Sequence, residues 1–559
     1  MLARLLSLAV LLVLCGCMGR QEIASGANAR SASARPNIVV IMFDDLSPRI
    51  RALGDPVAHT PALDRFAGEA VHYPNTFTTS PVCAPSRSAL MTGVHQQTLG
   101  TMHMRTRGAA GLRGGGPIEY DAVPPAQVKA FPELLRAAGY HTVNIGKFDY
   151  QFGEPFTMWD DAGPSADWRR RPGDRPFLAV INLQHTHESY LWPEETTSQN
   201  RLVQLVSERN RRDFANKVRR TDPAAVVVPP YLPDTPVVRQ DLARLYDNLS
   251  FDDQNVQRIM DALRADGVLD NTIVVVTSDH GDGLPRVKRA IHASGLRVPL
   301  LVRLPGGRRA TDSRLVSFVD LAPTILSWAG VPTPSWMQGH SLSQARRNRY
   351  VFAATDRFDE LQERRKTAID GRFQYIRSYG EEPFLRRLNF RDQLPSMQEL
   401  WRLQQAGQLT EVQARLFKPL PREQLFDLVA DPHTIRDLAA DPAHAARLRR
   451  MRAAMDAWLA RTPDLSAVPE ARMITQMWPG NVQPVTDPPV ASRTPAGSVS
   501  LHSATPGASI GYSLERAEPR AWRLYTGPVV VPAGATLHAK AIRYGFQVSP
   551  AVEVAAGRP

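Results

Sequence analysis

Short apolar runs rich in β-branched residues limit most strongly how this chain can fold. They cover residues 37–43, 141–146, 177–182 and 272–277, and each is followed by polar residues. Continuous apolar runs of this length are typical of strands that are buried on both faces of a parallel sheet. Residues 239–266 have apolar side chains at helical spacing. Strands alternating with helices predict an α/β fold, with a large central sheet flanked by helices.

Polar residues cluster directly after two of these runs. Asp44 and Asp45 follow the first run, and Asp279 and His280 follow the last one. In open α/β sheets, ligands bind beyond the carboxyl ends of the strands. We therefore expect these four side chains to lie at one site. The alternative for Asp44 and Asp45 is a helix cap after the strand.

The chain is long enough, at 559 residues, for two or three folded units. We expect the main α/β unit over residues 36–345 and a smaller α+β subdomain over residues 346–465. Residues 466–495 are rich in Pro, Thr and Val and are predicted to form a linker. Residues 496–559 contain strand-like segments separated by turn signals, which predict a small β-sandwich module.

The first residues have the pattern of an export signal. Arg4 precedes an apolar stretch that is too short to span a bilayer as a helix. The stretch ends in Leu14-Cys15-Gly16-Cys17, which resembles a bacterial lipobox with Cys17 as the lipidated residue. Residues 18–35 are predicted to form a flexible tether. We expect an exported protein that is lipid-anchored to a bacterial membrane, in the outer membrane or periplasm, or, if the signal is a simple secretory one, a periplasmic protein.

Cysteine content and charge narrow the function further. Two of the three cysteines lie in the export signal, so the folded part has Cys83 alone and no internal disulfide framework. A lone cysteine in an oxidising compartment is a liability unless it is buried or used. The net charge of +12 can attract polyanions such as nucleic acid or sulfated sugars. Because most of the cations are Arg, and Ala and Pro are also abundant, we interpret the charge first as coding bias. Basic runs interleaved with aromatic residues are missing from the sequence, so we expect no nucleic-acid partner.

The segment around Cys83 carries the most specific motif. Cys83-Ala84-Pro85-Ser86-Arg87, with Leu90-Met91-Thr92-Gly93 behind it, resembles the sulfatase signature Cys-x-Pro-Ser-Arg and its Leu-x-Thr-Gly tail. The resemblance to sulfatases covers roughly residues 36–465. It implies an alkaline-phosphatase-like α/β fold and hydrolysis of sulfate esters or sulfamates. It also implies that a maturation enzyme oxidises Cys83 to formylglycine.

The hydrated aldehyde explains why such a residue is useful. One of its two hydroxyls attacks sulfur to form a covalent sulfate ester, and loss of the proton from the other expels sulfate. In the family, Arg87 would fix this diol and pair with metal ligands, because its planar fork matches carboxylates. The resemblance also implies a Ca²⁺ site, since hard cations bind clustered oxygen ligands. Its ligands would be Asp44, Asp45, Asp279, His280 and the side chain of Cys83.

Three further segments resemble catalytic segments of the family. Lys147 stands in a Gly-Lys-x-His motif whose Lys holds the sulfate, although Asp149 replaces the His. His185 and His187 follow a predicted strand, as does the family's histidine-containing loop, and the spacing leaves open which of them acts. Lys288 has the spacing of the family Lys that reaches the leaving-group oxygen, where it could act as an acid.

The substrate implied by the resemblance is a sulfated sugar or glycan. Residues 228–236 and 425–432 resemble the sulfamidase (N-sulfoglucosamine sulfohydrolase) branch of the family, and residues 505–512 and 525–528 resemble the β-module of chitobiase-like enzymes. One alternative is a phosphodiesterase or phosphonate monoester hydrolase of the same superfamily. Another is a non-catalytic, sugar-binding lipoprotein. The complete set of Asp44, Asp45, Cys83, Arg87 and Asp279 argues against this last reading.

Overall fold

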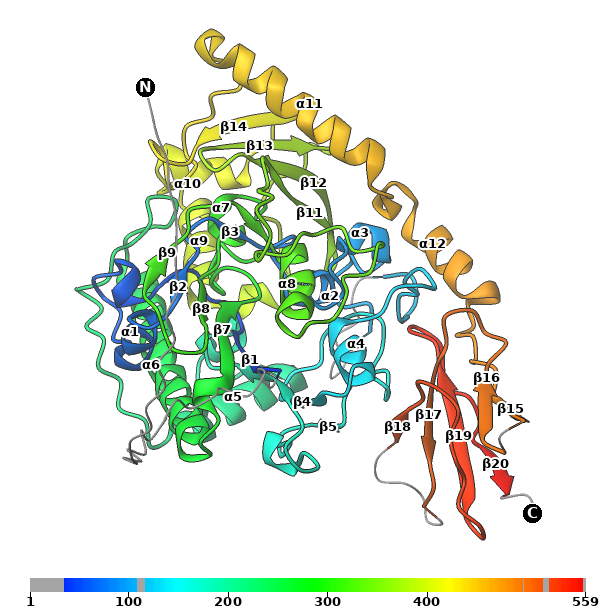
Figure 1. Cartoon of the computed structure of the whole chain (residues 1–559). Coiled ribbons are helices and arrows are strands. Elements are labelled where there is room, and N and C mark those ends of the chain that lie inside the picture. The colour runs from blue at the N-terminus through cyan, green and yellow to red at the C-terminus, as the bar shows by residue number, and fades with distance from the viewer. Residues whose placement is uncertain (1–34, 108–115, 496, 516–521, 556–559) are drawn as a thin grey trace, which may run out of the picture. The chain divides into compact units, whose positions relative to one another are not determined.

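The computed structural model of the protein describes residues 35–107, 116–495, 497–515 and 522–555 (Figure 1). The predicted export signal with Cys17, and the predicted tether up to residue 34, lie outside the described residues. In the described part of the chain, no helix combines the length and the apolar character needed to cross a membrane.

Within the described residues, the central sheet contains eight strands in the order β5-β4-β6-β1-β7-β8-β2-β9. The predicted strands are present as parallel neighbours; they are β1 (Asn37–Phe43), β4 (His141–Ile145), β6 (Phe177–Leu183) and β7 (Thr272–Ser278). β8 (Leu300–Arg303) pairs with β7 in the antiparallel direction, so the sheet is mixed. The short strands nearer the edges are β5 (Asp161–Ala162), β2 (Val71–His72) and β9 (Ala310–Thr311). The α/β prediction is confirmed.

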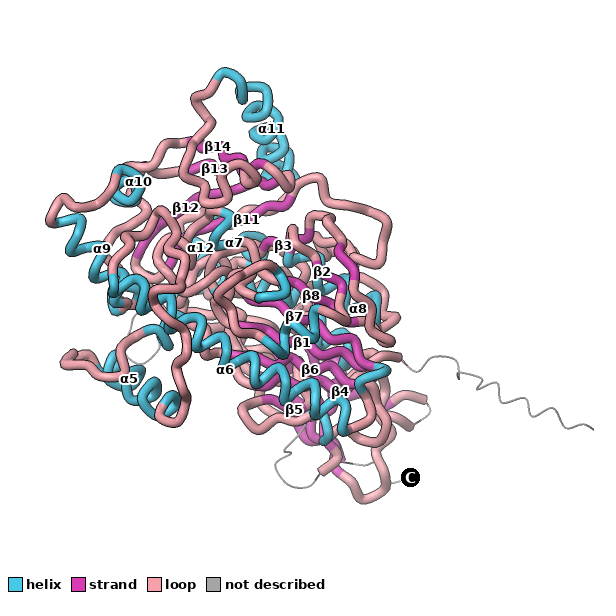
Figure 2. Tube along the Cα trace, turned by 90° about the vertical axis from the view of Figure 1, so that its left-hand side faces the viewer, coloured by secondary structure: helices cyan, strands magenta, loops and turns pink. Residues whose placement is uncertain are grey.

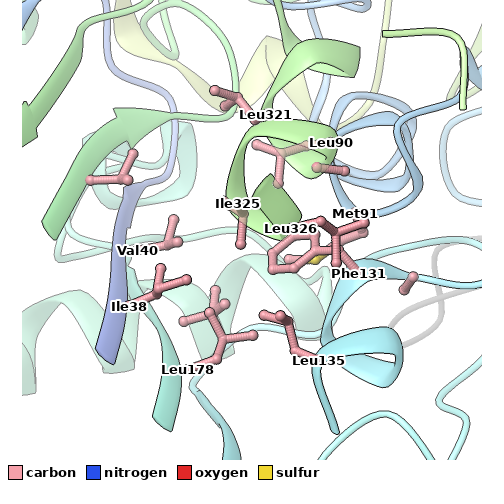
Figure 3. Close-up of a cluster of buried hydrophobic side chains, with 14 of the residues drawn as sticks. Ile38, Val40, Leu90, Met91, Phe131, Leu135, Leu178, Leu321, Ile325 and Leu326 are labelled. Atoms are coloured by element: carbon pink, nitrogen blue, oxygen red, sulfur yellow. The ribbon is translucent and has the colours of Figure 1, made fainter. Parts of the chain in front are cut away.

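Helices cover both faces of this sheet, which explains why all of β1 is buried. Alternate residues of a strand point to opposite faces, so Ile38 and Val40 pack on one side and Val39 and Ile41 on the other. The first face is covered by α2 (Cys83–Thr92), α4 (Phe131–Ala137) and α8 (Leu321–Trp328), as Figure 3 shows. The second face is covered by α1 (Pro61–Ala67) and α6 (Pro236–Ala265), the predicted long helix, which runs across the strands in Figure 2.

A third apolar cluster lies beside the amino-terminal half of α6. It joins α5 (Arg201–Phe214) and α9 (Pro395–Gln405) to α6 through Val203, Leu242 and Met397. The remaining short elements are β3 (Thr76–Phe77), which pairs with β10 (Val316–Ser317), and the helices α3 (Gln96–Leu99), α7 (Ala293–Leu296) and α10 (Glu411–Ala414).

The second region forms an antiparallel sheet with a long helix against it. The sheet has the order β11-β12-β13-β14, with β11 (Val351–Phe358), β12 (Leu361–Ile369), β13 (Phe373–Ser378) and β14 (Glu423–Asp427). α11 (Ala445–Arg461) buries Met451, Met455 and Trp458 against it, and the Trp458 ring stacks on Phe352 with a centroid distance of 4.7 Å. This region is therefore an antiparallel sheet with a helix packed on it, as expected for an α+β subdomain.

The segment that was predicted to be a linker is largely structured. It contains α12 (Glu470–Met477), whose Met473 and Ile474 are buried beside Tyr120. Glu470 forms an ion pair with the buried Arg357, with Nε and Oε2 2.6 Å apart. The many Pro and Thr residues concealed this short amphipathic helix.

The described residues of the C-terminal module form two small sheets around their own apolar core. β15 (Val490–Arg493) pairs with β16 (Val499–His502), and the second sheet has the order β18-β17-β19-β20. Its strands are β18 (Arg523–Leu524), β17 (Ser509–Ser513), β19 (Thr536–Ile542) and β20 (Val552–Ala555). The core includes Val499, Leu537 and Ala539. The first strand begins within the predicted linker, a few residues before the expected boundary.

One edge of this module is packed against α4 of the main unit. The buried Tyr544 donates a hydrogen bond to Glu133 Oε2 at 2.8 Å, and its ring stacks on Phe152. Two turns of the module approach the main unit so closely that only glycine fits. A Cβ atom at Gly507 or at Gly545 would collide with a backbone carbonyl of the main unit.

Candidate active site

The carboxyl ends of β1, β4 and β6 open onto a cleft of about 620 Å³. The side chains lining it include four residues that the sequence singled out, namely Asp44, Cys83, Lys147 and His187. The other lining residues are Met104, Arg105, Arg107, Asp121, Phe148, Asp149, Tyr150, Gln151, Gly153, Glu154, Gln184, Ser189, Tyr190, Arg209 and Phe390. The expectation that these strand ends form a site agrees with this geometry.

Cys83 is the first residue of α2, a helix in which every residue is buried. Its Sγ lies 3.3 Å from His280 Nε2, 3.7 Å from Lys288 Nζ and 3.9 Å from Asp45 Oδ1. Burial raises the pKa of the Cys83 thiol above its usual range, although Lys147 and Lys288 act in the opposite direction. An unmodified thiol here is therefore mainly neutral at physiological pH, and a neutral thiol is a poor nucleophile.

Arg87 lies one helical turn after Cys83, so both side chains are on the same face of α2. Its Nε donates to Asp279 Oδ2 at 2.8 Å, its Nη1 to Asn182 Oδ1 at 2.6 Å and its Nη2 to Asp44 Oδ1 at 3.1 Å. One fully buried guanidinium thus holds residues from the ends of β7, β6 and β1. Asn182 was missed by the sequence analysis, because its only signal is its position near the end of a predicted strand.

Four side chains at the centre of the site form a group that could hold a metal ion. Ligand atoms of Asp45, Cys83, Asp279 and His280 all lie within 4.8 Å of one another. Asp45 has a left-handed backbone, with φ of 62°, and its amide donates to Asp279 Oδ1 at 3.0 Å. The two buried carboxylates suit a hard divalent cation. The imidazole is a less usual Ca²⁺ ligand, and the Cys83 thiol stands for a formylglycine oxygen.

Asp44, also expected to be a metal ligand, lies outside this group of four. Lys147 Nζ donates to both of its carboxylate oxygens, at 2.9 and 3.1 Å, and Arg87 donates to one of them. Burial raises the pKa of Asp44, but Lys147 and Arg87 outweigh that effect and hold it well below its usual range. In this structure, Asp44 positions two cations at the cleft floor.

The two predicted lysines occupy different environments. Lys147 lines the cleft, where its ammonium can reach a ligand. Lys288 is buried below the cleft, and its Nζ lies 2.7 Å from Asp45 Oδ2 and 3.1 Å from Glu188 Oε1. Burial lowers the pKa of Lys288, but Asp45, Cys83 and Glu188 outweigh that effect and raise it above its usual range. These carboxylates hold the proton on Lys288, and its role as an acid stays a prediction.

The structure distinguishes the two candidate histidines. His187 lines the cleft, and its Nδ1 accepts a hydrogen bond from Ser189 N at 3.2 Å, which leaves Nε2 to carry the proton of the neutral ring. Burial, with Lys288 as the next contribution, lowers the pKa of His187 to about 3. His185 does not line the cleft, because its ring nitrogens bind Asp252 at 2.7 Å and Lys217 at 3.0 Å. A catalytic role is therefore favoured for His187 and not for His185.

Glu188 is a site residue that the sequence analysis did not identify. It is fully buried, contacts Lys288, and makes two hydrogen bonds with Arg289, at 2.8 and 2.9 Å. Its backbone amide donates to Asp45 Oδ2 at 2.8 Å. Its position directly after His187 was the only signal in the sequence.

Comparison with known proteins identifies the family of this chain. A family model described as Sulfatase matches residues 36–163 and 162–331. An ulvan-active sulfatase of Formosa agariphila is 38% identical over 546 residues, covering 93% of this chain and 91% of that protein. The chain belongs to the sulfatase family. It is therefore a sulfuric ester hydrolase, and the sulfatase signature identified around Cys83 lies inside the first matched segment.

Two further relatives extend this comparison to a human enzyme and a solved structure. Human N-sulphoglucosamine sulphohydrolase is 28% identical over 480 residues, covering 77% of this chain and 91% of that protein. A protein solved in complex with its substrate D-glucosamine-2-N,6-O-disulfate has a TM-score of 0.54 and 18% identity, covering 76% of this chain and 97% of that one. This structural likeness confirms the sulfatase-type fold. Sulfatases in general use formylglycine and a divalent metal, and the group around Asp45 is compatible with such a metal.

Proposed function

We propose that this sulfatase removes sulfate from sulfated glycans, with residue 83 acting as formylglycine. The observation that carries the proposal is the position of Cys83 on the cleft floor, beside the carboxylate and imidazole group of Asp45, Asp279 and His280. The names of the ulvan-active and N-sulphoglucosamine relatives support a polysaccharide or amino-sugar substrate, with either O-linked or N-linked sulfate.

The side chains around Cys83 support separate roles for the nucleophile, for the groups that bind the sulfate and for the residue that positions α2. Formylglycine would supply, in its hydrated form, a hydroxyl that attacks sulfur and a second hydroxyl whose deprotonation releases sulfate. Lys147 lies at the cleft floor and can donate to sulfate oxygens as they gain negative charge. His187, neutral and protonated at Nε2, can donate to the sulfate or to the leaving oxygen. Arg87 fixes the orientation of α2, and hence that of residue 83.

The metal in this proposal is Ca²⁺, held by Asp45, Asp279, His280 and the oxygen of residue 83. The ion would supply positive charge next to the sulfate. In the structure, the ammonium group of Lys288 also places positive charge next to Asp45, because Nζ donates to both of its carboxylate oxygens. Asp44 accepts hydrogen bonds from Lys147 and Arg87, and so positions the sulfate-binding cation. The role of Asp44 as a further metal ligand stays a prediction.

Kinetics of sulfate release test the proposed function. The wild-type chain, produced together with a formylglycine-generating maturation enzyme, should release sulfate from sulfated oligosaccharides. Cys83→Ala and Cys83→Ser should have no turnover, because one nucleophile carries the covalent step. Turnover by either variant at the wild-type rate would refute it. Comparison of an aryl sulfate with an aryl phosphodiester then separates a sulfatase from a phosphodiesterase.

We also propose that the protein is exported and anchored to a bacterial membrane through lipid on Cys17. The support is the pattern of residues 1–17, which lie outside the described structure. Cys17→Ser should yield a soluble form, because stable anchoring needs more than one acyl chain. Membrane fractions that still contain the Cys17→Ser protein would contradict the proposal.

A further inference from the structure

Arg209 is a cleft residue that has no role in the proposed chemistry. It lies on α5 and is half-buried. Its guanidinium rests on the Tyr190 ring, 3.7 Å from the centroid, and Nη2 donates to Ser189 Oγ and Asn210 Oδ1, both at 2.9 Å. All its protein acceptors are therefore neutral, and the aromatic contact fixes the orientation of the planar group.

The other strong cations that line the cleft are paired with carboxylates. Their closest N–O distances are 2.6 Å for Arg105 with Asp359, 2.6 Å for Arg107 with Asp121 and 2.9 Å for Lys147 with Asp44. Arg209 differs, because no carboxylate of a described residue forms an ion pair with it. In addition, its Nη1 makes no hydrogen bond with any described residue. The positive charge of Arg209 is therefore not neutralised by an ion pair, and Nη1 can donate hydrogen bonds to a ligand.

A hydrogen-bond chain connects Arg209 to the reaction centre. Ser189 Oγ accepts from Arg209 and lies 2.8 Å from His187 Nδ1. One serine side chain therefore separates the guanidinium from the histidine at the cleft floor. We therefore expect an anion bound by Arg209 to belong to a substituent or sugar unit that neighbours the scissile sulfate.

We propose that Arg209 forms a second anion subsite, which binds a carboxylate or a further sulfate on the glycan beside the sulfate that is removed. The inference rests on the proposed glycan sulfatase function and makes Arg209 a specificity-determining residue. Arginine matches both anions well, since its fork donates two parallel hydrogen bonds to carboxylate or sulfate oxygens. The subsite would favour polyanionic glycans over sugars that carry a single sulfate.

Matched substrates test this subsite. The first pair is a sulfated disaccharide that contains a uronic acid and the same compound with the carboxyl group reduced to an alcohol. The second pair is a disaccharide with and without a second, non-scissile sulfate. For each pair, the preference is the ratio of kcat/KM for the more charged to the less charged compound. Arg209→Gln should lower this preference about 10- to 100-fold in one of the pairs, the effect of one charge-assisted hydrogen bond.

The pair that responds identifies the anion as a carboxylate or a sulfate. The loss should appear mainly as a higher KM, and Arg209→Lys should restore part of the preference. The matched control is Arg212→Gln on the same helix, because Arg212 is exposed and outside the cleft lining. It should leave both preferences unchanged. Because each preference is a ratio measured on one enzyme preparation, a general loss of folded protein cancels.

Two results would overturn the inference in distinguishable ways. If both preferences are unchanged in Arg209→Gln while the wild type hydrolyses the disaccharides, Arg209 does not bind an anion. If the wild type hydrolyses an aryl sulfate but none of the disaccharides, the proposal that the substrate is a sulfated glycan is wrong, and the subsite inference falls with it.

Discussion

At the scale of single residues, the site is a set of buried charges that neutralise one another. Arg87 and Lys147 form ion pairs with Asp44, and Lys288 forms one with Asp45. Breaking such a pair leaves a buried charge without its partner, which is much more costly than losing a surface pair. Each of these residues therefore contributes to the fold as well as to the chemistry.

The metal prediction belongs to this scale. Asp45→Asn and Asp279→Asn should each lower both bound Ca²⁺ and the turnover rate, because each removes a carboxylate from the four-residue group. Exhaustive chelation of the wild type should do the same. The measurement is metal content by elemental analysis, taken alongside the rate.

The control for this experiment is Asp282→Asn. Asp282 is buried nearby and is paired with Arg49 at 2.7 Å, but it is outside the metal group. It should retain the metal. Zinc in the active enzyme, or active enzyme without metal, would contradict the Ca²⁺ proposal.

Another residue-scale prediction concerns pH and stability. Burial raises the pKa of Asp356 to about 7, although Lys366 lies 3.9 Å away and acts in the opposite direction. The folded state thus binds a proton that the unfolded state has already released. This contribution to stability is complete below the unfolded pKa of 3.8 and is lost as pH rises towards 7.

Asp356→Asn removes this dependence. The free energy of unfolding of the variant, relative to the wild type, should increase from pH 5 to about pH 7 by about 1.4 kcal/mol per pH unit, because unfolding of the wild type releases the proton in this range. The difference should level off towards pH 8, where folded Asp356 has also lost its proton. Denaturant unfolding at these pH values measures it. A difference that does not change with pH would show that Asp356 is charged throughout in the folded protein.

How much of the site could be predicted depended on whether the residues share a local motif. Cys83 and Arg87 stand in one segment that resembles the sulfatase signature, and Asp44 and Asp45 follow one predicted strand, so the local sequence was sufficient for these four. Asn182 and Glu188 could not be identified in this way, because their partners Arg87 and Lys288 are about a hundred residues away. The sequence could not distinguish His185 from His187. In the structure, the contact between His185 and Asp252 favours His187 as the histidine of the cleft.

At the scale of elements, the strands were easier to predict than the segments between the units. Buried parallel strands such as β1 have uniform apolar sequences. α12 was missed because its apolar face is short, with Met473 and Ile474 fully buried in a Pro-rich context. Its position depends on tertiary contacts, since helices this short are marginal in isolation.

The contact between α12 and β11 leads to a prediction for an element. Glu470→Gln should lower the free energy of unfolding by about 1–3 kcal/mol, because it removes the carboxylate that accepts two hydrogen bonds from the buried Arg357. The control is Glu411→Gln, which affects an exposed ion pair with Arg415 and should cost less than about 0.5 kcal/mol. Equal effects in denaturant unfolding would mean that α12 is only loosely attached.

At the scale of the whole molecule, the described residues of the C-terminal module pack against the main unit without lining the cleft. All the residues that line the cleft lie between Asp44 and Phe390. The module instead covers α4, where Tyr544 and Ser509 both donate to Glu133. Among the turn signals predicted for this module are Thr505-Pro506-Gly507 and Tyr544-Gly545. The sequence could not show that both glycines also allow the module to pack closely against the main unit. The backbone carbonyls that they approach belong to the main unit, far away in the sequence.

A truncation near residue 480 tests this division. The shortened chain should lose thermal stability, because Glu133 loses two hydrogen-bond donors and apolar surface on α4 becomes exposed. Its kcat/KM on a small aryl sulfate should stay within about twofold of the full chain, since the cleft is unchanged. Loss of that turnover in a truncated chain that still folds would show that the module completes the site.

A pair of point variants refines this test without removing the module. Tyr544→Phe deletes the hydrogen bond that Tyr544 donates to Glu133, whereas Tyr525→Phe deletes one that Tyr525 accepts from Leu501 N inside the module. Only the first should weaken the attachment of the module to α4, as measured by limited proteolysis of the intact chain. Equal protease sensitivity would contradict the assigned contact.

The mass of the peptide that contains residue 83 tests the central claim most directly. In active protein purified from its native host, conversion of the Cys83 thiol to formylglycine should lower the peptide mass by about 18 Da. The account predicts that turnover scales with the converted fraction across preparations. Full activity in a preparation whose residue 83 is entirely unmodified cysteine would contradict it.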